Sequence, residues 1–285
     1  MRLSRRLAQG GLALMLVTLL TGCSLVSVTY NRLPTWMLWR LDAMLGLTDT
    51  QSAVVRPALA DWHDWHRQAH LPRYAAALRQ WQTLARDDLT ADQVCQAFEQ
   101  VREWGLQAAE RLLPVMAALA PSLSDAQIDR WNRHQRRQDA RFAQDFIDPP
   151  GQVSPQRLKR AIDRAEMLYG RLDDDQRAWL AQRLADNPFD GEHALAQRQR
   201  RHAETVATVE RIRAGADPVR EVQAGWNRVL VPPTEAERRA SEQQTLAACV
   251  QLAELHNRTT AAQRERAVQR LQGFEREFLA LSNGR

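Results

Sequence analysis

Three histidines lie close together in the sequence and have the spacing of a metal site. His63, His66 and His70 follow one another at steps of three and four residues, so on a helix they share one face. Imidazoles arranged in this way bind Zn²⁺ or Cu²⁺, but a closed site needs a ligand from a second element, and no such partner stands out. We therefore expect a helix with its tryptophans inward and its histidines at the boundary. A His-rich metal binder remains an alternative function.

Cys95 and Cys249 are two further residues whose side chains can do chemistry. In an oxidising compartment such thiols form a disulfide, which here would close a long loop. Each also lies in an Ala-rich helical stretch, where a cysteine packs as a small hydrophobic residue. The sequence leaves both states open, a Cys95–Cys249 disulfide or two packed thiols.

Sequence signatures of catalysis are missing. There is no Gly-x-Ser-x-Gly, no His-Glu-x-x-His, no phosphate-binding loop, no Gly-rich dinucleotide turn and no paired-cysteine zinc spacing. We expect a protein that is not an enzyme, with no catalytic residues and no cofactor.

The elements that position these side chains are expected to be helices. Of 285 residues, 44% are hydrophobic and 26% charged, and Gly and Pro number only 12 each, which excludes a collagen-like or wholly disordered chain. No alternating strand pattern or strand-turn-strand signal is present. We expect an all-α fold, an irregular bundle of about ten helices. The predicted helices lie near 34–46, 49–69, 72–86, 91–119, 125–147, 155–170, 174–186, 191–214, 218–230, 235–257 and 261–281.

Capping boxes mark most of these helix starts. An oxygen-bearing residue is followed three places later by Gln or Glu, so each side chain can bond the backbone N–H of the other. The six boxes are Thr48…Gln51, Thr90…Gln93, Ser124…Gln127, Asp173…Gln176, Thr234…Glu237 and Thr260…Gln263, and Ser154-Pro155 and Asp217-Pro218 add two more starts. Pro57 and Pro114 should kink or split their helices. Residues 148–151 are the clearest break and a candidate seam between two halves.

The amino terminus has the pattern of a signal peptide. Basic residues at 2, 5 and 6 precede an apolar run over 12–20 that is too short to span a bilayer comfortably. Leu20-Thr21-Gly22-Cys23 then resembles the lipobox of bacterial lipoproteins, in which the Cys is diacylated, the signal is cut before it and the new amine is acylated. The resemblance implies a signal peptide over 1–22, a lipidated Cys23 with a short tether over 23–29, and an all-helical periplasmic domain over 30–285.

The same resemblance implies a location and partners. Ser24 follows the Cys, where an Asp would favour the inner membrane, so we expect the periplasmic face of the outer membrane. The expected partners are the lipid bilayer through acylated Cys23, the lipoprotein processing and sorting machinery, and an unidentified envelope protein. Nucleic acid is not an expected partner. Removing the three arginines of the signal from the formal charge of +5 leaves only +2 on the mature chain.

The first helix after the tether is apolar nearly all round, with Trp36, Met37, Leu38 and Trp39 in succession. One interpretation is an interfacial helix whose tryptophans rest at lipid headgroups. The other is a helix buried by its neighbours. We favour burial, because the polar face is too small for a helix that lies on a surface.

Two arginine-rich stretches follow, and we expect solvated helix faces whose charges pair with nearby acids. Acidic headgroups or lipopolysaccharide phosphates are the alternative targets. The stretches are Arg130, Arg133, Arg136, Arg137 and Arg141 with His134, and Arg198, Arg200, Arg201, Arg211 and Arg213; the expected acidic partners are Asp129, Asp139, Glu204 and Glu210.

Two further resemblances concern the whole chain. Tyr30-Asn31-x-Leu33-Pro34-x-Trp36-x-x-Trp39-x-x-Asp42, Trp65-His66-Arg67 and Leu71-Pro72-x-Tyr74 resemble an uncharacterised family of proteobacterial lipoproteins with a domain of unknown function. Leu47-Thr48-x-x-Gln51, Leu89-Thr90-x-x-Gln93 and the close Leu123-Ser124-x-x-Gln127 resemble, more weakly, periplasmic stress chaperones, which are helical cradles for unfolded clients.

These observations lead to one expected function and two alternatives. We expect a membrane-anchored periplasmic lipoprotein that acts by binding or by supporting the envelope. The alternatives are a chaperone that holds unfolded clients and the His-rich metal binder.

Overall fold

The computed structural model describes residues 25–147, 153–186 and 189–284, and within them it contains thirteen α-helices, one 3₁₀ helix and no strand. The predicted all-α class is confirmed. The signal peptide 1–22, Cys23 and the candidate seam at 148–151 lie outside the described residues. The helices are α2 (Leu25–Asn31), α3 (Leu33–Leu45), α4 (Asp49–Ala69), α5 (Leu71–Leu84), α6 (Ala91–Glu110), α7 (Leu113–Leu119), η1 (Ala120–Ser122), α8 (Asp125–Phe146), α9 (Pro155–Tyr169), α10 (Asp174–Asp186), α11 (Gly191–Arg213), α12 (Pro218–Leu230), α13 (Glu235–Asn257) and α14 (Ala261–Ser282).

Most predicted helix bounds agree with these to within two residues, and the two prolines behave differently. The helix predicted over 91–119 is two helices, because Pro114 stands in the first turn of α7 and cannot continue α6. By contrast, α4 runs through Pro57 without a break, so the expected split there is wrong.

Five of the six predicted capping boxes are confirmed, whereas at the sixth Thr234 accepts from the Glu237 N–H but the Glu237 carboxylate does not complete the box. Thr48, Thr90, Ser124 and Thr260 each accept a hydrogen bond from the backbone N–H three residues on, and the glutamine at that position accepts one in return. Asp173 and Gln176 make the same pair of bonds. These bonds satisfy backbone donors that a helix start would otherwise leave free.

Four of the box glutamines also join distant helix starts in two pairs. Gln51 and Gln127 bond each other through both amide groups, at 3.2 and 2.7 Å, and connect the starts of α4 and α8. Gln176 and Gln263 do the same at 2.8 and 2.9 Å and connect the starts of α10 and α14. We call these the first and second glutamine pairs.

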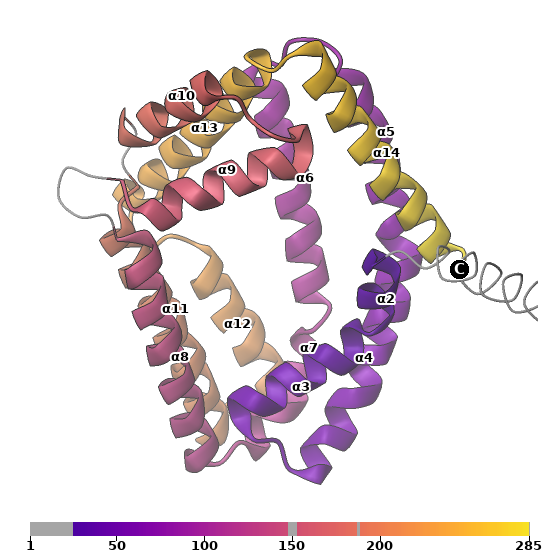
Figure 1. The fold of residues 1–285 in the computed structure, drawn as a ribbon. Helices are drawn as coiled ribbons and strands as arrows, with labels where there is room; N and C mark the ends of the chain where they lie inside the picture. Colours follow the sequence, from indigo (N-terminus) through magenta and orange to yellow (C-terminus); the bar gives the residue numbers. More distant parts are fainter. Residues whose placement is uncertain (1–24, 148–152, 187–188, 285) are drawn as a thin grey trace, which may run out of the picture.

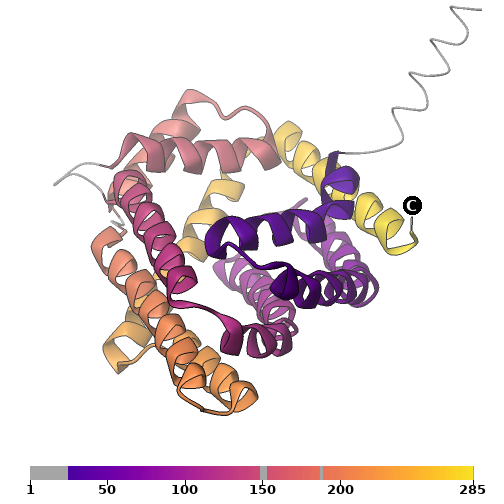
Figure 2. The ribbon, with the colours of Figure 1, turned by 90° about the horizontal axis from the view of Figure 1, so that it is seen from below.

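The helices form an open frame (Figure 1). Helices α4, α5 and α14 form one side, α9, α10 and α13 the top, and α8 with α11 the opposite side, while α3 and α7 form the bottom. The first and last described helices, α2 and α14, lie near each other. Arg67 on α4 connects them, because it donates to the Leu281 carbonyl of α14 at 3.0 Å and to Asn31 Oδ1 of α2 at 2.6 Å. Seen from below, α3 lies across the near side of the frame (Figure 2).

The interior is divided into separate apolar clusters. One lies between α9, α10, α13 and α14 around Tyr169, Leu172 and Leu180, and another lies between α3, α4 and α7 around Leu45 and Val55. Helices α6 and α13 pack together, and the structure joins them by a disulfide between Cys95 and Cys249, with the two Cα atoms 5.3 Å apart.

Candidate ligand pocket

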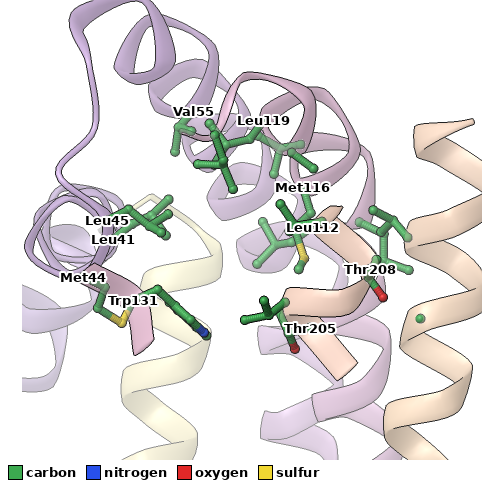
Figure 3. A pocket seen from close by; sticks show the side chains of 18 of the residues that line it. Leu41, Met44, Leu45, Val55, Leu112, Met116, Leu119, Trp131, Thr205 and Thr208 are labelled. Carbon is green, nitrogen blue, oxygen red and sulfur yellow. The ribbon is translucent and has the colours of Figure 1, made fainter. Parts of the chain in front are cut away.

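The bottom of the frame encloses a pocket with a volume of about 570 Å³. Its walls come from α3, α4, α7, η1, α8, α11 and α12, which are far apart in the sequence (Figure 3). This volume lies within the ~300–1,000 Å³ of small-molecule sites.

The lining of the pocket is almost wholly apolar. The buried side chains of the second cluster form one wall, and α11 and α12 form the facing wall. The apolar lining residues are Met37, Leu41, Met44, Leu45, Val55, Leu59, Leu112, Leu113, Val115, Met116, Leu119, Ala120, Leu123, Ile128, Val206, Val209, Val222 and Val229, together with the indoles of Trp36, Trp131 and Trp226. Such a wall favours a hydrocarbon ligand over a charged one.

The hydroxyl groups of the two threonines that line the pocket already donate hydrogen bonds within their own helix. Thr205 donates to the Arg201 carbonyl at 2.9 Å and Thr208 donates to Glu204 at 3.2 Å. The indole of Trp131 differs, because its Nε1 is buried and has no hydrogen-bond partner in the described part of the chain. In Figure 3 this nitrogen points into the pocket, toward the side where Met116 and Thr205 lie. A buried donor without a partner costs free energy, but this N–H has almost no accessible surface, so a ligand atom reaches it only if the indole or its neighbours shift.

Exposed residues stand at the edge of the pocket on two helices, Trp36 and Arg40 on α3 and Met116, which is 45% exposed, on α7. The Arg40 guanidinium lies 5.6 Å from the centre of the Trp36 ring. The site therefore combines an apolar interior, one buried donor and a cation at the rim.

Local geometry keeps the walls of the pocket in place. At the end of α3, Gly46 adopts a positive φ of 69°, and the Leu47 N–H donates to Asp42 Oδ1 at 2.8 Å. On the far wall, Gly225 lets α12 approach α11, because a Cβ there would lie 2.3 Å from Thr208 Oγ1.

The three candidate metal ligands lie together but are bonded to tyrosines. Tyr30 OH and His66 Nδ1 are 2.8 Å apart, Tyr74 OH lies 3.2 Å from His66 Nε2 and 3.1 Å from His70 Nδ1, and His63 Nε2 donates to the Tyr30 carbonyl at 3.0 Å. Among the described residues, no group of three His, Cys, Asp or Glu is placed to hold a metal ion. The network instead attaches α2 to α4 and α5.

The expectation that these histidines lie at the boundary of the helix is wrong, because His63, His66 and His70 are all buried, and burial disfavours the charged form of each. Burial lowers the pKa of His63 and His70, and together with His70 and His63 it lowers the pKa of His66 to about 4. A second His–Tyr contact lies between α9 and α13, where Tyr169 OH and His256 Nδ1 are 3.0 Å apart.

The two arginine-rich stretches have different surroundings. On α11, Arg198 pairs with Asp139 at 3.3 Å and Arg211 pairs with Glu204 at 2.6 Å, so two of the expected acidic partners are confirmed. On α8, Arg133, Arg136, Arg137 and Arg141 are exposed and form no ion pair with any described residue. The expected pairing is therefore wrong for α8.

The favoured interpretation of the first helix also needs correction. Only Leu45 of α3 is buried, whereas Trp36 and Trp39 are 54% and 61% exposed. No helix in the described part of the chain combines the length and the hydrophobicity needed to cross a bilayer.

Sequence reasoning missed the pocket altogether. Its lining residues come from seven elements, and each has the helical spacing of an ordinary core residue. The one signal within a single segment is the exposed rim on α3, which the sequence did not distinguish from a buried face.

Comparison with known proteins gives one match. Residues 43–222 match a family of unknown function, DUF6279, over more than half of the chain. This range includes the walls that α4, α7, α8 and α11 contribute to the pocket. No curated protein and no solved structure matches the chain.

Proposed function

The chain belongs to the family of unknown function DUF6279, and we propose that it is an envelope lipoprotein whose pocket binds the hydrocarbon chain of an amphiphile. The observation that carries this proposal is the apolar pocket of about 570 Å³ at the bottom of the frame. Large apolar pockets with few polar groups are the usual sites of small apolar ligands.

The polar groups of the pocket suit an acyl chain that carries an oxygen. The buried Trp131 N–H is a donor for a carboxylate or ester oxygen, and Arg40 at the rim is a cation for an anionic head group. A plain hydrocarbon would leave Trp131 without a partner, so the geometry favours a fatty acid or a fatty acyl ester.

The location remains part of the proposal. The lipobox at 20–23 supports acylation of Cys23 and attachment to the periplasmic face of the outer membrane. The Cys95–Cys249 disulfide supports an oxidising compartment such as the periplasm. Mass spectrometry of the purified protein tests the anchor, because the proposal requires that residues 1–22 are absent and that Cys23 carries acyl groups.

Photolabelling tests ligand binding with the anchored protein in its own membrane. Cells receive a fatty acid with a photoreactive diazirine, and the labelled peptides are identified after irradiation. We expect label on peptides of α7, α8 and α11. Thr205→Phe places a ring in the pocket and should lower that label by about tenfold or more, since the ligand loses its space.

Thr245→Phe is the matched control. Thr245 is exposed on α13 and donates to the carbonyl four residues back at 2.9 Å, as Thr205 does, but it lies outside the pocket. Label that is equal in the two variants would contradict the proposal.

A chaperone for unfolded clients is the second candidate. It is favoured by Phe98 and Val101, which are 37% and 51% exposed on α6, the helix that crosses the frame in Figure 1. A holdase slows aggregation of reduced insulin, and Phe98→Ser with Val101→Ser should weaken that effect while Thr205→Phe leaves it unchanged. Crosslinking in cells distinguishes it from an envelope-support protein, which would capture one dominant species.

A further inference from the structure

The exposed side of α3 has the composition of a membrane-contacting surface. Trp36 and Trp39 are three residues apart and so lie on the same side of the helix, and each leaves more than half of its surface in solvent. Indoles are large and apolar with one polar atom, which suits the boundary between lipid and water. Arg40 follows on the next turn and adds a cation beside the Trp36 ring.

A stripe of cations runs along α8. Arg133, Arg137 and Arg141 recur every four residues and therefore lie along one side of this helix. All three are exposed, and within the described residues none has an acidic partner. Cations without acidic partners produce a local positive field that attracts anionic surfaces.

Helix α3 touches α8, and this contact brings Arg40 of α3 near the cations of α8. Arg130 Nε on α8 donates to the Ala43 carbonyl of α3 at 3.4 Å, so the two helices are in contact. His134 lies between the cations of both helices: burial lowers its pKa, and Arg137, Arg40 and Arg141 lower it further. We call the surface of Trp36, Trp39, Arg40 and the arginine stripe the α3–α8 face.

The chain that leads to Cys23 joins the body next to α3, the part of the α3–α8 face that carries Trp36 and Trp39, whereas α8 lies on the far side of the frame. Helix α2 begins at Leu25, and two residues of extended chain span at most ~7 Å. Beyond that point the chain is fixed to the body, because Asn31 Oδ1 accepts from Arg67 at 2.6 Å and Tyr30 bonds His66. A lipid on Cys23 would therefore hold the body against the bilayer without a long flexible linker.

We propose that the α3–α8 face docks on the anionic surface of a lipid bilayer, with Trp36 and Trp39 at the headgroup level and the arginine stripe over acidic lipids. The inference rests on the lipid anchor of the proposed function and extends it. Trp36 and Arg40 also stand at the edge of the pocket, so docking places that edge at the lipid. An acyl chain then enters from the membrane without crossing water.

Tryptophan quenching tests the docking. The acylated protein is reconstituted in vesicles of equimolar phosphatidylcholine and phosphatidylglycerol whose acyl chains carry bromine, which quenches only indoles near the lipid. We expect quenching of the wild type, and we expect Trp36→Phe with Trp39→Phe to remove most of it. Trp179→Phe, on α10 at the top of the frame, is the control and should leave the quenching unchanged.

The charge requirement has its own matched variants. Arg133→Gln, Arg137→Gln and Arg141→Gln together should lower the quenching in vesicles with phosphatidylglycerol and should have no effect in phosphatidylcholine alone, because only the former are anionic. Arg270→Gln removes an exposed cation from α14, on the side of the frame opposite α8, and should change little.

Three outcomes separate this inference from the proposed function. Quenching that is the same in the Trp36/Trp39 double variant as in the wild type would overturn the docking, even if the photoreactive fatty acid still labels the pocket. If the quenching persists but the photoreactive fatty acid does not label the pocket, the docking is supported and the proposed ligand is contradicted. If α3 forms crosslinks to one protein and its indoles are not quenched, the proposed docking on a bilayer is overturned, and the face binds a protein partner instead.

Discussion

The two glutamine pairs make nearly the same hydrogen bonds, but the packing of the apolar side chains beside them differs. In each, two box glutamines bond each other and donate to carbonyls just before the partner helix: Ser122 and Gly46 in the first pair, Arg258 and Arg171 in the second. Each joint thus connects two helix starts through side chains that also cap those helices.

The second pair stands beside a filled interior. Tyr169, Leu172 and Leu180 are 1–2% exposed and pack with the Ala267 of α14. The cluster beside the first pair includes Leu45, Val55 and Leu119, all of which line the open pocket. The presence of a pocket therefore does not follow from the presence of a glutamine pair. It depends on which side chains the neighbouring helices contribute at each joint.

The largest expected effect comes from truncating one leucine in each interior. Leu180→Ala should lower the free energy of unfolding by about 4 kcal/mol, because it leaves a cavity in packed surroundings. Leu119→Ala should lower it by about 2 kcal/mol, because that side chain already faces open space on one side.

Urea denaturation of the two variants measures the comparison. Val101→Ala, on the exposed side of α6, is the reference and should change stability by less than about 0.5 kcal/mol. Equal losses for Leu180→Ala and Leu119→Ala would mean that the pocket is as well packed as the core between α9 and α14.

Removing a paired glutamine has the next largest effect and should be alike in the two joints. Gln127→Ala and Gln263→Ala each remove both bonds between the paired amides and leave a carbonyl, that of Gly46 or Arg171, without its amide donor, so each should cost about 2 kcal/mol. Gln93→Ala removes the same capping box without a pair and should cost about 0.5 kcal/mol. Thermal or urea unfolding gives the three values; a cost for Gln93→Ala that matched the others would show that the cap alone matters.

Acidification should act mainly through the Tyr30–His66 network. Burial lowers the pKa of His66 to about 4, so below about pH 6.5 the unfolded chain binds a proton that the folded chain does not. Stability is therefore constant above this range and is lost as the pH falls from about 6.5 to about 4.

Urea midpoints across this pH range test the sign and the location. His66→Gln should flatten the dependence, and His256→Gln should flatten it less, because His256 is one histidine with a lowered pKa whereas His66 lies among three. A His66→Gln variant that loses as much stability as the wild type would assign the effect to other groups.

Only one of the resemblances found in the sequence is confirmed by the comparisons. The match to DUF6279 confirms a domain of unknown function, while the lipoprotein anchor and the chaperone likeness remain proposals. The Leu-Thr-x-x-Gln strings at Gln51 and the close one at Gln127 do more than cap, because their amides bond each other, whereas the string at Gln93 only caps.

Local sequence signals are enough to predict where most helices begin and end. A capping box such as Thr48…Gln51 is closed by atoms within four residues of one another, so its outcome does not depend on the rest of the fold. The all-α class follows for the same reason, since local spacing and the scarcity of Gly and Pro already favour helices.

Three properties depend on how the helices pack and cannot be predicted from one segment. They are the pairing of the glutamines, the burial of α3 and the presence of the pocket. Trp36 and Leu45 belong to one apolar helix, yet the first is half exposed and the second is 7% exposed, because only one side of α3 faces α4 and α8. Trp131 lies near Thr205 only after α8 and α11 have packed. Such properties depend on which surfaces of distant segments meet, and helical spacing within one segment carries no information about its partner.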